Sequence, residues 1–367
     1  MTFGRRWLVV LAGVGVLVAL PAVVAARPVP SRSIGAAALL ARIQGSSGVG
    51  YRGYAESAGG LDLPVTGQFG GLADLFGGRT RLRVWWRSGQ DWRVDSVGVA
   101  GETDTHTSRE GSWRWNYEAN TATFVPYTGD PRVRLPADAD LLPPQLGRRL
   151  LSEARPAEAS RIGSRRVAGR VAAGLRVRPA QAASTVDRVE VWADPSSGLP
   201  LGVEVYGKAG GTALASRFLD LSLGLPPPAS TRFTPPAGAS AGTTPGQDLA
   251  SAIDQLGGAS PPPRLAGFDR NRELPTLGSI GVYGRGVTEF AVVPLPRRVA
   301  YSLHDQLQPG SADTTAASQS ALLTAGPIDL LLGPADQPAG PWLLVGTVTA
   351  PTLAAALAEL PAWEGLR

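Results

Sequence analysis

VEVWADPSSGLPLGVEV, residues 189–205, is the stretch that decides the fold of this chain. In each arm two valines flank one glutamate, at 189–191 and again at 203–205. Apolar and polar residues that alternate in this way are typical of a strand with one buried face. The segment DPSSG between the arms supplies turn-forming residues. We therefore predict a β-hairpin with one apolar and one polar face.

Similar alternation extends the prediction from one hairpin to a meander of strands. Residues 81–86, 92–95 and 113–117 alternate in the same way, and turn-forming glycines or asparagines separate them. Two amphipathic helices are expected, over residues 33–44 and 138–154, from leucines and isoleucines at near-helical spacing. The second has Pro143 and Pro144 near its start, where proline is tolerated. A helix there could lie across the sheet.

Four motifs resemble one family of envelope proteins. They are the strand ending in Trp192-Ala193-Asp194, the Gly-Leu-Pro turn at 198–200, FTPPAG at 233–238 and VAGRVAAGLRVRP at 167–179. Together they resemble the carrier superfamily of LolA, LppX and the MucB/RseB sensors, and they are closest to MucB/RseB. The resemblance implies an α+β fold, in which an open antiparallel β-barrel, or half-barrel, surrounds an apolar cavity and is covered by helices. A smaller C-terminal α+β domain is implied beside it.

Composition shifts and the resemblance together divide the chain into four parts. Residues 1–27 read as a signal peptide or an N-terminal membrane anchor. Residues 33–240 contain the quoted motifs, and the resemblance implies a LolA-like domain there. Residues 241–265 are a Pro-, Gly- and Ala-rich linker with a short helix. Residues 266–367 carry short strands and a closing helix, and they resemble the C-terminal domain of MucB/RseB proteins.

The N-terminal segment and the charge balance bound the location and the partners. Two arginines precede an uncharged stretch from residue 7 to residue 26, which predicts export, either with cleavage after Ala26 or with retention as an anchor. Cysteine is absent, which excludes disulfides and thiolate metal sites. The net charge is +5, and 30 acidic residues are interleaved with the basic residues along the chain. Nucleic acid is therefore not an expected partner.

Residues for catalysis are sparse. The two histidines, His106 and His304, lie about 200 residues apart, and no metalloprotease, nucleophile-elbow or phosphate-loop spacing occurs. The carboxylates of residues 91–104 are expected to be solvated edge residues, and His106 is expected to be an exposed hairpin residue. We therefore predict no enzyme, no catalytic residues, no metal site and no cofactor.

The remaining prediction is binding by an apolar surface. The concave face of the sheet is expected to collect side chains that line either a ligand cavity or a packed core beneath helix 138–154. These are Leu82, Val84, Trp86, Trp92, Val94, Trp113, Trp115, Val189, Val191, Val203 and Val205.

The resemblance implies a membrane-proximal, extracytoplasmic sensor that binds a lipid or an acylated lipoprotein and contacts a membrane partner such as an anti-sigma factor. A LolA/LppX-like carrier of lipid or lipoprotein is one alternative. A wall-associated structural protein is another.

Overall fold

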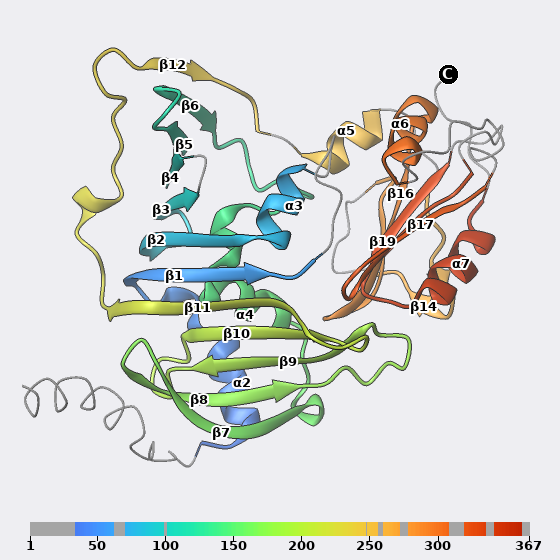
Figure 1. Ribbon diagram of the computed structural model, residues 1–367, viewed down its shortest axis with the longest axis horizontal. Coiled ribbons are helices and arrows are strands. Elements are labelled where there is room, and N and C mark those ends of the chain that lie inside the picture. The colour runs from blue at the N-terminus through green and yellow to red at the C-terminus, as the bar shows by residue number, and fades with distance from the viewer. Residues whose placement is uncertain are drawn as a thin grey trace, which may run out of the picture.

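Two β-sheets organise the chain (Figure 1). The computed structural model describes residues 34–61, 70–98, 101–246, 248–255, 260–271, 278–307, 319–334 and 341–361. The predicted export segment, residues 1–27, lies outside the described residues. Within the described part, no helix has the length and apolar character needed to cross a membrane.

The large sheet has 12 strands in the order β12-β6-β5-β4-β3-β2-β1-β11-β10-β9-β8-β7, with β12 and β7 as its free edges. The sheet is open, as predicted for a half-barrel. Its strand pairs are antiparallel except for β12–β6, which is parallel. The strands are β1 (Tyr51–Gly59), β2 (Arg79–Ser88), β3 (Asp91–Gly98), β4 (Gly101–Thr107), β5 (Gly111–Asn116), β6 (Thr121–Pro126), β7 (Ala159–Val167), β8 (Arg170–Val177), β9 (Val186–Ala193), β10 (Pro200–Gly207), β11 (Thr212–Leu223) and β12 (Ser240–Thr243).

The hairpin predicted from residues 189–205 is confirmed as β9 and β10. Val189 pairs with Val205 and Val191 pairs with Val203. Asp194 and Gly198 shape the turn between the strands, and Gly198 has a φ of +74°, which favours glycine. A Cβ on Gly198 would lie 2.2 Å from the carbonyl oxygen of Arg42, so the turn packs directly on the first helix.

Helices α2 (Ala36–Gln44) and α4 (Pro143–Leu151) cover the apolar face of the large sheet, as predicted. Helix α2 buries Leu39, Leu40 and Ile43. Helix α4 lies on β10 at Gly147, where a Cβ would come within 2.9 Å of the Pro200 side chain. The predicted helix over 138–154 is a 3₁₀ turn, η3 (Asp138–Leu141), followed by α4, because Pro143 and Pro144 can only begin a regular helix.

A second, five-stranded sheet carries a core of its own, in the order β15-β16-β19-β18-β17. Its strands are β15 (Gly281–Arg285), β16 (Thr288–Pro294), β17 (Ala321–Ala325), β18 (Ile328–Leu332) and β19 (Trp342–Gly346). Helices α6 (Arg297–Leu307) and α7 (Ala350–Glu359) pack against it.

The connection between the two sheets is itself structured. Residues 240–243, at the end of the predicted first domain and the start of the predicted linker, form β12 and pair with β6. Helix α5 (Leu249–Gln255) follows, and then the short pair β13 (Arg264–Leu265) and β14 (Phe268–Asp269). The remaining short helices are η1 (Ser46–Gly48), α3 (Gly70–Gly77), η4 (Pro156–Glu158) and η5 (Pro228–Ser230).

Candidate functional site

All the predicted cavity residues except Trp113 and Trp115 gather on the inner face of the large sheet. They are buried in one apolar cluster beneath α2 and α4, or packed against it in the case of Trp92. Burial is complete at Leu82, Val84 and Val191. This arrangement makes the inner face the core of the first domain. The apolar surface ends at β3, because the next inward positions are threonines on β4 and Arg114 on β5.

Trp113 and Trp115 lie on the opposite, outer face. In the register of β4 and β5, Trp113 pairs with His106 and Trp115 with Asp104, and His106 in turn pairs with Arg93. The inward position on β5 is taken by Arg114. The two tryptophans are covered by Phe233, at ring-centroid distances of 5.7 and 6.1 Å. The FTPPAG motif therefore covers an aromatic patch on the outer face.

An ion-paired cluster lies beside this patch. Arg93 donates to Asp95 Oδ1 at 2.5 Å and to Asp104 Oδ2 at 3.0 Å. Asp95, Asp104 and His106 are all buried. The expectation of solvated carboxylates was therefore wrong for these two aspartates, although Asp91 and Glu102 are partly exposed, and the expectation of an exposed histidine was wrong. His106 Nδ1 lies 3.0 Å from the carbonyl oxygen of Thr231, on the segment that covers the cluster.

Burial shifts the pKa values of the cluster. Burial, followed by the nearby Asp95, raises the pKa of Asp104 to about 7. Burial also lowers the pKa of His106. Ligand atoms of Asp95, Asp104 and His106 lie within 4.8 Å of one another, as at a metal site. Because the Arg93 guanidinium already pairs with both carboxylates, the cluster is an ion-pair network and we do not assign a metal to it.

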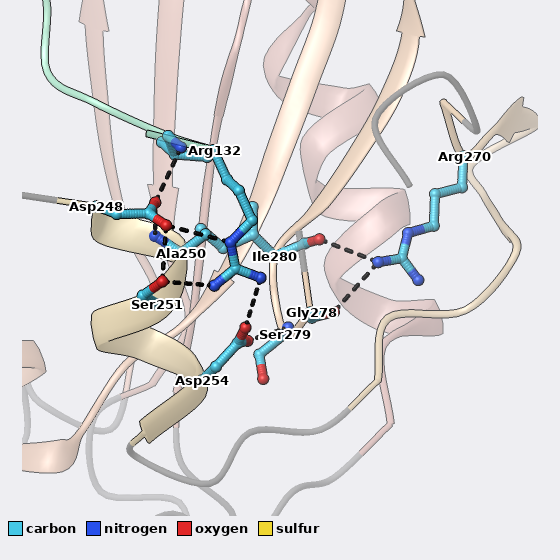
Figure 2. Close-up of polar contacts among 10 residues, drawn as sticks. Arg132, Asp248, Ala250, Ser251, Asp254, Arg270, Gly278, Ser279 and Ile280 are labelled. Carbon is cyan, nitrogen blue, oxygen red and sulfur yellow. Dashed lines mark hydrogen bonds and ion pairs between the residues drawn. The ribbon is translucent and has the colours of Figure 1, made fainter. Parts of the chain in front are cut away.

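A second polar cluster joins the two domains (Figure 2). Arg132, on the loop after β6, donates to Asp248 at 3.2 Å and to Asp254 at 3.0 Å, at the two ends of α5. Asp254 also accepts from the backbone N–H of Ser279 at 2.8 Å, ahead of β15. Helix α5 is thus held between the first sheet's loop and the second sheet.

Further inter-domain contacts start just beyond α4. Arg285 Nη2 donates to Glu158 at 2.6 Å and Nη1 donates to the carbonyl oxygen of Glu153 at 2.7 Å. Glu153 Oε2 accepts from the backbone N–H of Gly286 at 3.0 Å. Burial and the adjacent Glu153 raise the pKa of Glu289 to about 7. A polar hollow of about 730 Å³, lined by Arg155, Arg270 and Arg285 among others, lies at this boundary.

These features define the fold, an open and mostly antiparallel sheet under two short helices, with a second small sheet domain. No protein-family model matches the chain, and no curated protein matches it by sequence. Solved structures do resemble it. A LolA superfamily protein from Nitrosomonas europaea is 11% identical, with a TM-score of 0.24 over 55% of this chain and 99% of that chain.

Structures of MucB resemble more of the chain. MucB in complex with MucA(peri) is 17% identical with a TM-score of 0.49, over 89% of this chain and 98% of that chain. The Pseudomonas aeruginosa MucA/MucB complex is 18% identical with a TM-score of 0.48, again over 89% and 98%. The chain is thus similar in fold to LolA-like proteins and to MucB, as the sequence motifs predicted.

Sequence reasoning missed both polar clusters. The outer cluster depends on Phe233 and Thr231, more than 120 residues beyond His106 in the chain. Arg132 is 116 residues from Asp248. One signal was available in the sequence. Phe233 opens the FTPPAG motif that carries the family resemblance, and Thr231 lies two residues before it.

Proposed function

We propose that this protein is a non-catalytic, extracytoplasmic sensor or regulatory protein of MucB/RseB type. Its first domain would bind the acyl part of a lipid or lipoprotein at the inner face of the large sheet, by displacing α2 or α4 from the packed core. Its second domain would contact a membrane partner such as an anti-sigma factor. The partner class comes from the motif resemblance of the sequence.

The observation that carries the proposal is the cover of the inner face. Two helices of nine residues each lie over a wide apolar surface on a sheet that is not closed. An acyl chain that enters such a surface contributes roughly 0.8 kcal/mol for each buried methylene, so about ten methylenes suffice for micromolar binding. The second domain is joined to the first by ion pairs. Ligand binding in the first domain could therefore change these contacts.

Native mass spectrometry tests the ligand. The chain is purified without detergent from bacterial cells, and the bound fraction is extracted and weighed. A stoichiometric acyl-bearing mass is the expected result. An empty, well-folded monomer would contradict the lipid-binding part of the proposal.

The partner is tested first by a search of the neighbouring genes for a single-span anti-sigma protein, which a sensor of this type is expected to have. Its extracytoplasmic segment is then titrated calorimetrically into this protein. Saturable binding that changes when lipid is loaded is expected of a sensor. Lipid binding together with no affinity for that segment would instead favour the carrier alternative.

A further inference from the structure

An aromatic row crosses four strands of the inner face. Phe218 on β11 meets Tyr51 on β1 edge-on at 5.7 Å, and Tyr51 stacks on Trp86 of β2 at 6.0 Å between ring centroids. Trp86 stacks on Trp92 of β3 at 5.5 Å. The interplanar angles of the two stacked pairs are 5° and 7°, so the rings of Tyr51, Trp86 and Trp92 stack nearly parallel in one apolar column, with Tyr51 next to α4.

Three hydrogen-bond donors along this row have no partner. Tyr51 Oη, Trp86 Nε1 and Gln145 Nε2 are buried and make no hydrogen bond within the described part of the chain. Tyr51 is 0% exposed and Trp86 is 6% exposed. Gln145, on α4, lies beside the Tyr51 hydroxyl, yet the two groups do not reach the distance and angle of an ordinary hydrogen bond. Buried polar groups are nearly always hydrogen-bonded, so three unsatisfied donors together need an explanation.

Arg148, one turn further along α4, adds a positive charge at the same place. Its Nη2 donates to Gln145 Oε1 at 2.6 Å, which directs the Gln145 amide nitrogen elsewhere. Burial lowers the pKa of Arg148, and Tyr51 is the titratable group that interacts with it. No carboxylate of the described residues lies within 4.0 Å of Arg148, whereas Arg93, also partly buried, pairs with two. A partly buried guanidinium without a counter-charge is destabilising.

We propose that Arg148, Tyr51, Trp86 and Gln145 form a binding site for an anionic group, a carboxylate or a phosphate. All four side chains carry hydrogen-bond donors, and the Arg148 guanidinium carries a positive charge that a bound anion would neutralise. The aromatic row beside them suits an alkyl chain. This inference rests on the proposed function and names the ligand class, which is an acidic amphiphile. Arg148 and Trp92 are partly exposed and mark the side from which it enters.

The test compares three probes on the full chain by calorimetric titration: dodecyl phosphate, dodecanol and inorganic phosphate. Dodecyl phosphate is expected to bind about tenfold or more tightly than dodecanol, as a charge-assisted contact implies. Arg148→Met should remove this preference. Arg149→Met, an exposed arginine on the same helix, is the matched control and should retain it.

A second variant guards against misfolding. Tyr51→Phe removes only the unsatisfied hydroxyl, so its melting temperature should stay level or rise while its affinity for dodecyl phosphate falls. Equal affinity for dodecyl phosphate and dodecanol in the wild type would overturn the anion site and leave the proposed function intact. Failure of both amphiphiles to bind would contradict the proposed function itself. Inorganic phosphate that binds alone and competes would identify a free anion as the ligand, and its failure to bind would identify a lipid headgroup.

Discussion

Replacement of Asp194 by alanine should destabilise the first domain by about 3 kcal/mol. Its Oδ1 accepts from the backbone N–H groups of Ser196 at 3.0 Å and Ser197 at 2.9 Å, and from the Ser197 hydroxyl at 3.2 Å. Each lost bond contributes about 1 kcal/mol net in a partly buried turn. The ion pair with Arg170, at 3.1 Å, adds no more than about 0.5 kcal/mol because the Arg170 side chain is 38% exposed.

Urea unfolding followed by tryptophan fluorescence measures the change, with Asp194→Asn as the control. Asparagine keeps an acceptor for the two turn N–H groups and loses the charge, so it should lose only about 1 kcal/mol. Burial opposes ionisation of Asp194, but hydrogen bonds from Ser197, Arg170 and Ser196 bring its pKa below the ordinary value. Its stabilisation is therefore present above about pH 4 and is lost as pH falls, so the gap between wild type and Asp194→Ala should narrow at pH 3. Equal losses in the two variants would refute the assignment of the turn N–H groups as the main partners.

Three further predictions concern the outer face and the domain boundary. Trp115→Asp places an unpaired carboxylate at a position that is 6% exposed, so it should lower the free energy of unfolding by about 3 kcal/mol or abolish soluble expression. The control is Tyr117→Asp, at a position that is 68% exposed, and it should leave the melting temperature unchanged. Arg132→Ala leaves two carboxylates without their cation and should speed hydrogen exchange in α5, with exchange in β9 unaltered. Burial raises the pKa of Asp104 to about 7, so the contribution of its protonated form to stability is fully present below about pH 4 and is lost as pH rises to 7. Asp104→Asn should therefore flatten the pH–stability curve between about pH 4 and pH 7. An unchanged slope in this variant would count against the raised pKa.

The fold could be predicted where apolar alternation is strong, and faces were assigned correctly only there. In β2, Leu82, Val84 and Trp86 alternate with arginines and a tryptophan, and their inward direction is confirmed. Strand β4 reads GETDTHT and has no apolar residue to mark the buried side. A register change of one residue reverses every side chain that follows. The direction of Trp113 and Trp115 on β5 could therefore not be derived from the sequence.

The burial of His106 was unpredictable for another reason. Its neighbours in sequence are threonines and aspartate, which are typical of an exposed strand. It is covered by residues 231–233, which return across the sheet after β11, and the Phe233 ring contacts the His106 ring at a centroid distance of 4.8 Å with a tilt of 36°. Local patterns carry no information on such long connections. The same limitation applies to the pairing of Arg132 with α5.

Helix α4 is the element that relates the two domains to a ligand. Its residues Gln145 and Arg148 lie beside Tyr51 of the aromatic row. Glu153, two residues past its end, bonds to Arg285 and Gly286 of the second domain. A group bound beneath α4 that displaced the helix would act on these contacts directly. A carrier has no need of such a connection, whereas a sensor requires one two-state element that both sites can bias. The position of α4 therefore supports the sensor proposal over the carrier alternative.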